Sequence, residues 1–207
     1  MRSRRVQWLK AATHLGGLLP LAVLIWLYAQ NRLGPVPIAA VIRRTGRYGL
    51  AFLILSLVPT VVRTVTGYSE LLSVRRWLGL YAFLYAALHF LAFAGLDYGF
   101  SFGLIVQAIR EGRREIAGGV ALIILGVLAI TSIRHLMVRL GKNWKRLHRG
   151  AYLAAALVVL HYLWNYKELR VWPILSGIAL LLLLAARLPP VADQLQRLRG
   201  ARQQGSR

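Results

Sequence analysis

Six long apolar runs divide the chain and restrict what it can fold into. They cover residues 9–29, 48–66, 77–96, 116–133, 149–166 and 171–187. Each approaches the length of about 20 residues with which an α-helix crosses a hydrocarbon layer of about 30 Å. A mean hydropathy of +0.55 and a hydrophobic content of 57% also exceed the values of soluble domains. The sequence predicts an all-α integral membrane protein, with a single six-helix transmembrane bundle over residues 1–207.

The basic residues lie between these runs. Their placement indicates both which class of partner the protein binds and how the chain is oriented in the membrane. A net charge of +21 suggests nucleic-acid binding only when the basic residues share one soluble face. Here about two thirds of the 27 Lys and Arg residues fall in the N-terminal segment, the second and fourth connections and the C-terminal tail. Basic connections stay on the cytoplasmic side, so we expect both termini in the cytoplasm and no nucleic-acid partner. The basic inner side is expected to contact the anionic lipid of the bilayer.

Two histidines inside the apolar runs are the strongest candidates for chemistry. His89 lies about 18 Å along the third run from Trp77, and His161 lies about 18 Å along the fifth run from Arg149. Both runs start on the inner side, so the two imidazoles are expected at one level in the outer half of the bilayer. Neutral imidazoles on facing helices can supply both axial bonds of a low-spin heme b, and the alternative for each is a buried histidine that hydrogen-bonds a neighbouring helix. The chain has no cysteine, so any heme is bound non-covalently.

A second candidate site lies near the inner surface. His148 precedes His161 by 13 residues, which is about 20 Å along a helix and about 220° around it. It is a third candidate axial ligand of heme iron, or one end of a flavin or quinone site. Arg75 occupies the position on the third run where a matching second ligand is expected, and it could contact heme propionates, bind a flavin phosphate or end the helix. His14 and His135 are expected to be solvated or interfacial, although a quinone headgroup at His14 stays open.

Two other interpretations of the intramembrane histidines stay open. A proton-coupled transporter uses such residues as proton relays, but the third to fifth runs contain no acidic residue in their apolar parts. A cofactor-free anchor subunit would need no histidine pair at matched depth. We identify no internal repeat. The 20 residues after Arg187 are too few for a nucleotide-binding domain, so electrons are expected to come from a separate molecule.

The chain resembles a known family in several motifs. They are WLK at 8–10, HLGGLLP at 14–20, RRWLGLY at 75–81 leading to His89, GKNWKRLHR at 141–149, and HYLW at 161–164. These motifs are similar to those of the MsrQ (YedZ) family, which belongs to the ferric-reductase-like transmembrane superfamily. The resemblance extends over nearly the whole chain. Related ferric reductases and NADPH oxidases have two histidines on each of two helices, whereas this chain has Arg75 at the fourth position.

The resemblance implies a specific role. Members of this family are heme-binding subunits of a bacterial protein-methionine-sulfoxide reductase system in the inner membrane. It implies electrons from membrane quinol or a cytoplasmic flavin reductase, passed through one or two hemes b, with FMN as a further candidate cofactor. It also implies a periplasmic, MsrP-like molybdopterin subunit as the acceptor. Other cytochrome b-type anchors and ferric-reductase-like subunits remain the alternatives.

Overall fold

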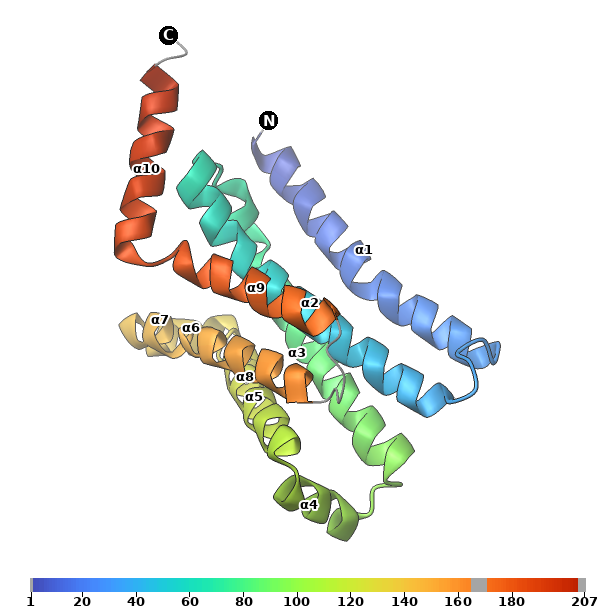
Figure 1. Cartoon of the computed structure of the whole chain (residues 1–207). Helices are drawn as coiled ribbons and strands as arrows, with labels where there is room; N and C mark the ends of the chain where they lie inside the picture. The colour runs from blue at the N-terminus through green and yellow to red at the C-terminus, as the bar shows by residue number, and fades with distance from the viewer. Residues whose placement is uncertain (1, 165–170, 205–207) are drawn as a thin grey trace.

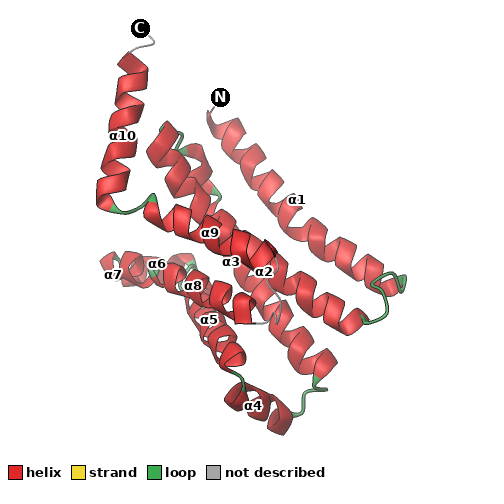
Figure 2. Ribbon diagram, in the orientation of Figure 1, coloured by secondary structure: helices red, strands yellow, loops and turns green. Residues whose placement is uncertain are grey.

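The computed structural model describes residues 2–164 and 171–204, and all regular structure in these residues is helical (Figure 2). The long helices are α1 (Arg2–Ala29), α2 (Pro37–Thr66), α3 (Arg75–Leu91), α5 (Arg113–Ile130), α8 (Gly150–Trp164), α9 (Val171–Ala185) and α10 (Pro189–Gln204). The shorter elements are η1 (Glu70–Ser73), the π-helical η2 (Ala92–Asp97), α4 (Phe102–Glu111), α6 (Arg134–Leu140) and α7 (Lys142–Leu147).

Two helix pairs form the centre of the bundle. Helix α2 packs along α3, and α5 packs along α8, while α9 lies across α2 and α8 (Figure 1). Helix α1 flanks α2 and α3 at the edge of the bundle. Both chain termini lie at one end, and the α1–α2 turn and α4 lie at the other (Figure 1). Following the orientation expected from the sequence, we call these the inner and outer ends.

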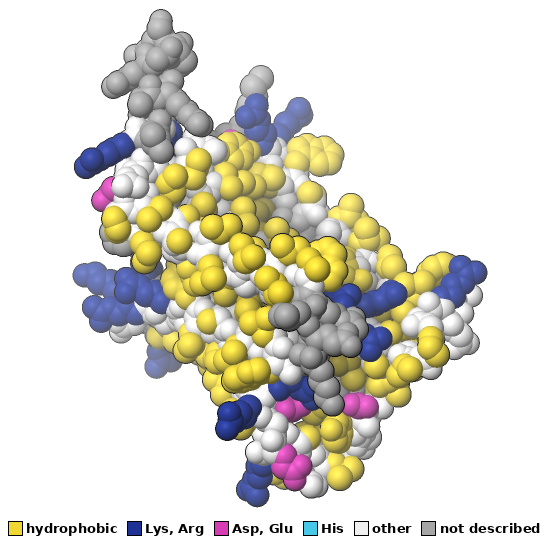
Figure 3. Space-filling view, in the orientation of Figure 1, with side chains coloured by type: hydrophobic (Ala, Val, Ile, Leu, Met, Phe, Trp, Pro, Cys, Tyr) yellow, Lys and Arg dark blue, Asp and Glu magenta, His cyan; other side chains and the backbone are white. Residues whose placement is uncertain are grey.

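Several helices have the length and composition of membrane spans. Helices α1, α2 and α3 with η2 qualify individually, and the described residues give up to five spans if each of two bent pairs is counted as one. The bends measure 93° between α5 and α6 and 77° between α9 and α10. Hydrophobic side chains cover the middle of the molecule, and Lys and Arg gather toward its margins (Figure 3). This is the surface of a multi-pass membrane protein, although the count of six spans stays a prediction.

The first and third connections contain more helix than the sequence patterns predict. Helix α2 begins at Pro37, which occupies its first turn, and not near residue 48. Hydropathy places the start too late because Arg43, Arg44 and Arg47 lie in the first turns of this helix. Similarly, the expected loop at 97–115 contains the short amphipathic helix α4. Among the described residues, the outer end is therefore built largely from helix ends rather than from long loops.

Small residues bring the central helices close together. Ala82 of α3 and Ala154 of α8 are fully buried, as are the larger side chains of Leu57 and Tyr85. Small side chains at crossings allow the close backbone approach that stabilises helix pairs in membranes. Helix α2 continues through Pro59 and ends at Gly67, which has the left-handed φ of 80° that favours glycine. This packing holds α3 against α5, the helix that packs along α8, with the histidines of α3 and α8 toward the outer end.

Candidate functional site

The structure brings His89 and His161 together at one level of the bundle. His89 lies near the outer end of α3, and His161 lies near the end of α8. Their ring centroids are 6.0 Å apart, and the ring planes cross at 86°. The two imidazoles come from sequence segments 72 residues apart, so only the packing of α3 against the α5–α8 pair makes them neighbours.

Each imidazole is held by a backbone carbonyl of the neighbouring helix. The Nδ1 atom of His89 lies 2.8 Å from the oxygen of Ile42 in α2. The Nδ1 atom of His161 lies 2.8 Å from the oxygen of Arg114 in α5. A carbonyl can only accept, so Nδ1 is the protonated nitrogen that donates in both rings. This tautomer leaves Nε2 with a free lone pair, and neither Nε2 has a hydrogen-bond partner among the described residues.

A glycine of the neighbouring helix lies next to each histidine ring. A Cβ atom at Gly46 of α2 would lie 3.0 Å from Nδ1 of His89, and one at Gly118 of α5 would lie 2.8 Å from Nδ1 of His161. Both distances are shorter than ordinary contact with a Cβ, so any larger residue would push the ring away. The absence of a side chain at these two positions allows the imidazoles to reach the carbonyls.

These contacts form a repeated arrangement. In both pairs the histidine follows its carbonyl partner by 47 residues, and the glycine stands four residues after that partner. The pair α2–α3 and the pair α5–α8 therefore hold their histidines in the same way, although few residues are identical between them. The recurring separation of glycine and histidine is the signal in the sequence that indicates this shared arrangement.

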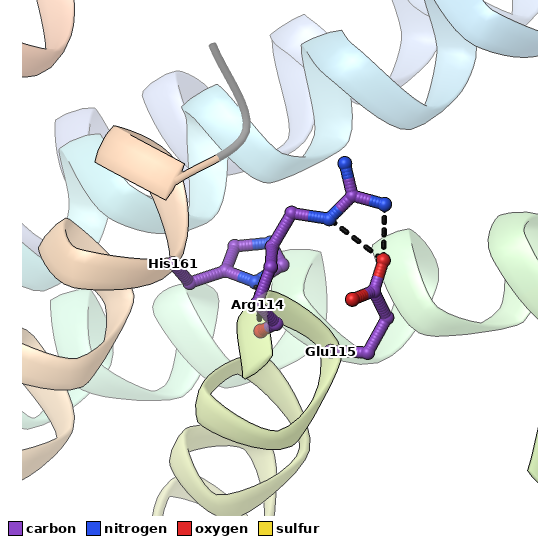
Figure 4. Close-up of polar contacts among 3 residues, drawn as sticks. All are labelled: Arg114, Glu115 and His161. Atoms are coloured by element: carbon purple, nitrogen blue, oxygen red, sulfur yellow. Dashed lines mark hydrogen bonds and ion pairs between the residues drawn. The ribbon is translucent and has the colours of Figure 1, made fainter. Parts of the chain in front are cut away.

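The outer end of this site also contains an ion pair. Figure 4 shows Arg114 with its carbonyl at His161 and its guanidinium at the carboxylate of Glu115. It is the one ion pair found in the parts of the chain that the structure describes. The Arg114 side chain is 41% exposed and that of Glu115 is 12% exposed. The peptide carbonyl that orients His161 therefore belongs to a residue whose side chain is itself fixed.

The arrangement fits a metal ion bound between two imidazoles. A metal–imidazole bond of about 2 Å, added to about 1.1 Å from the nitrogen to the ring centre, places two axial rings about 6 Å apart. The observed 6.0 Å agrees with this value. Orientation of a ligand histidine by a carbonyl at its other nitrogen is typical of metal sites. In the described residues, no group of three or more His, Cys, Asp or Glu side chains could hold a metal ion.

Comparison with known families identifies the bundle. The profile of the ferric reductase like transmembrane component matches residues 45–159, which is just over half of the chain. The chain belongs to the ferric-reductase-like transmembrane family. Membership indicates a role in membrane electron transfer, and members often bind heme. The matched part of this family member includes Gly46, His89 and Gly118, while His161 follows its end by two residues.

The ferric-reductase-like chain has its third candidate ligand, His148, at the inner end, away from the other two. Its Nε2 lies 3.2 Å from Oγ1 of Thr131, and its ring stacks on Trp144 at 4.0 Å between centroids. Burial lowers the pKa of His148 below its usual value, and the positive charge of Arg75 lowers it further. The structure places neither His148 nor Arg75 at the His89–His161 pair.

One residue of the inner end was not predicted from sequence. Arg187 follows α9, and its Nη1 donates to the hydroxyl of Tyr152 at 2.7 Å, while its Nη2 donates to the carbonyl of Leu57. A single arginine at the end of an apolar run is expected to face the headgroups, and nothing in its sequence context indicates that it turns inward. Arg187 therefore adds a fixed positive charge to the inner site of this family member.

The remaining histidines lie outside both sites. His14 of α1 contacts α3, where its Nδ1 lies 3.0 Å from the hydroxyl of Tyr81 and its ring meets Trp77 edge-on. His135 lies in α6 and is exposed, in agreement with its expected solvation. His14 thus has a packing role at the α1–α3 contact.

Proposed function

We propose that this ferric-reductase-like chain is a heme b electron-transfer subunit, with His89 and His161 as the two axial ligands. The observation that supports this most is the pair of imidazoles 6.0 Å apart, each with Nδ1 bound to a carbonyl. Two histidines packed only for stability would not need matching tautomers with both Nε2 atoms left unpaired. A shared cofactor explains both features at once.

The chain's own residues set the properties of such a site. A bound heme would supply one-electron redox chemistry at its iron. The carbonyls of Ile42 and Arg114 hold each ring in one tautomer and raise the basicity of its Nε2. Gly46 and Gly118 allow the rings to approach these carbonyls. Both rings are half-buried among apolar helices, and dryness and ligand basicity are two of the factors that set the potential of a heme.

The finer proposal is that electrons cross the bacterial inner membrane from inside to outside. The motifs shared with the MsrQ family support membrane quinol or a cytoplasmic flavin reductase as donor, and a periplasmic MsrP-like molybdopterin subunit as acceptor. The His89–His161 pair lies toward the outer end of α3 and α8, so the acceptor is expected to dock on the α1–α2 turn and α4. The product of that partnership would be repair of oxidised methionine in periplasmic proteins.

In the same proposal, electrons enter the protein at the inner end of the bundle. His148 and Arg75 are expected to line a second cofactor site, either for a second heme b or for FMN. Arg75 cannot ligate a metal because a guanidinium stays protonated. Its expected role is therefore to bind a negatively charged group of the cofactor rather than an iron atom.

Spectroscopy of the purified protein tests the proposal. We expect a low-spin Soret band with α and β bands that sharpen on reduction, and at least one heme b per chain by the pyridine hemochrome assay. Protein that is folded and monodisperse but has no heme absorption, even when produced with added heme, would refute the proposal. A cofactor-free anchor or a proton-coupled transporter would then be the better interpretation.

A further inference from the structure

Two arginines from distant parts of the chain converge on one face of α2 near its inner end. Nη1 of Arg75, in the first turn of α3, donates to Oγ1 of Thr60 at 3.3 Å. Nη2 of Arg187, after α9, donates to the carbonyl of Leu57. Leu57 and Thr60 are three residues apart, and residues at this spacing lie on the same face of a helix. The two guanidinium groups are therefore about one helical turn apart.

No carboxylate balances these two charges within the described residues. The ion pair found there joins Arg114 and Glu115 at the opposite end of the bundle. Like charges in a poorly solvated place repel each other strongly, because the low dielectric of the interior does not screen them. Two buried or half-buried cations without a counterion are normally paired with a bound anion.

One nitrogen atom of the Arg187 guanidinium has no hydrogen-bond partner. This guanidinium lies over the ring of Tyr152 at 5.1 Å and donates to the hydroxyl of that residue. With Nη2 bound to the Leu57 carbonyl, the group is fixed in place. Its Nε is completely buried and has no hydrogen-bond partner. A buried N–H group without an acceptor is costly, and such cases call for an explanation.

The position of this cluster separates it from the axial histidines. Leu57 lies 11 residues from Gly46 along α2, which is about 16 Å at the rise of an α-helix. Tyr152 lies in the first turn of α8, and Arg187 lies two residues after the end of α9. Both helices have their inner ends here, so the cluster lies in the inner half of the bundle.

We propose that Arg75 and Arg187 bind a phosphate group at the inner end of the bundle. Arginine suits this ligand because its planar fork of N–H groups matches phosphate oxygens. The same chemistry is offered by the headgroup of an anionic phospholipid and by the phosphate of a flavin mononucleotide. The inference extends the inner site of the proposed function by one residue, Arg187, and it does not depend on a heme at His89 and His161.

Ligand binding to the full-length protein in detergent tests this site. The protein is first delipidated, and its thermal midpoint is then followed with increasing phosphatidylglycerol, phosphatidylcholine or FMN. A ligand that binds only the folded state raises the midpoint. We expect phosphatidylglycerol or FMN to stabilise the wild type, with phosphatidylcholine as the zwitterionic control. Stabilisation by the first identifies a lipid site, and stabilisation by FMN identifies a cofactor site.

Matched variants show whether the response comes from this cluster. Arg187→Gln and Arg75→Gln are each expected to need about tenfold more ligand or more, because a charge-assisted hydrogen bond is lost. Arg146→Gln removes the same charge from an exposed position of α7 and is expected to behave like the wild type. Since Arg187→Gln also loses contacts to Leu57 and Tyr152, Arg75→Gln decides the question if that variant does not fold.

Two results would overturn the inference. One is a wild type that neither phosphatidylglycerol nor FMN stabilises. The other is a response that Arg75→Gln leaves at the level of Arg146→Gln. A wild type without heme would instead refute the proposed function, and the phosphate titration would still give its own answer.

Discussion

Replacing Gly118 by alanine should disturb the His161 ring without unfolding the protein. An added Cβ would lie 2.8 Å from Nδ1 and 2.9 Å from Cε1 of His161, and ordinary contact begins at 3.4 Å, so the ring must move by about 0.6 Å. Such a shift stretches the bond from Nδ1 to the Arg114 carbonyl from 2.8 Å to about 3.4 Å, beyond the usual range of a hydrogen bond.

The two effects of Gly118→Ala on the free energy of folding should nearly cancel, whereas its effect on cofactor binding should not be compensated. Loss of the hydrogen bond costs about 1 kcal/mol, and replacing a helical glycine by alanine contributes about 1 kcal/mol in the opposite direction. Metal sites, however, tolerate displacements of only about 0.5 Å, and loss of a bond that orients a ligand lowers metal affinity about tenfold or more. We therefore expect Gly118→Ala to fold but to retain much less low-spin heme.

The adjacent glycine provides a control in the same turn of α5. A Cβ at Gly119 would meet nothing within 4 Å, so Gly119→Ala should keep its heme and gain stability from the better helix former. The heme-to-protein ratio, the low-spin Soret band and the thermal midpoint are measured for both variants. Equal heme content and identical spectra in Gly118→Ala and Gly119→Ala would refute the role assigned to the glycine and its carbonyl.

Three further predictions concern the ligands, the orientation and the donor. His89→Ala and His161→Ala should each remove most low-spin heme, because the iron loses one of two axial bonds, and unchanged spectra in both variants would end the proposed pairing. Reporter fusions after Arg44 should be exported and fusions after Lys142 should stay in the cytoplasm; an exported Lys142 fusion would show the reverse orientation. NADH alone should not reduce the heme, whereas a quinol analogue or a flavin reductase with its nicotinamide should, and direct reduction by NADH without another protein or flavin would contradict a separate donor.

The meeting of His89 and His161 could be predicted from the sequence because it depends on few assumptions. Helical rise fixes the depth of a residue once the end of its span is known, and Trp77 and Arg149 mark those ends. The one further assumption is that the helices that carry His89 and His161 face each other. The exact start of α2 was harder to predict. Arg43 and Arg44 lower the hydropathy of their turn, although this turn is part of the helix. Apolar runs indicate where a helix is buried and not where it begins.

The backbone carbonyls that accept hydrogen bonds from His89 and His161 could not be predicted from helical rise. Any residue of a neighbouring helix offers a carbonyl, so the choice of Ile42 and Arg114 depends on which helices pack together and in what register. The side chains of these two residues have nothing in common, and only their backbone is used. Glycine placement was a more informative signal, because Gly46 and Gly118 both precede a histidine by the same number of residues. Arg187 had no such signal, since its role depends on the bend after α9.

The two helix pairs α2–α3 and α5–α8 agree at the outer end and differ at the inner end. A shift of 72 residues relates Ile42 to Arg114 and His89 to His161, and both pairs therefore present an imidazole at the outer level. The same shift relates His148 to Arg76, which is exposed on the surface of α3. One pair thus has an imidazole at the inner level, and the other has none to match it. The cationic side chain that does turn inward there is Arg75, and a guanidinium has no lone pair to give to iron. We therefore propose a metal ion between two like ligands at the outer end, and an anion at the inner end, where Arg187 adds a second guanidinium.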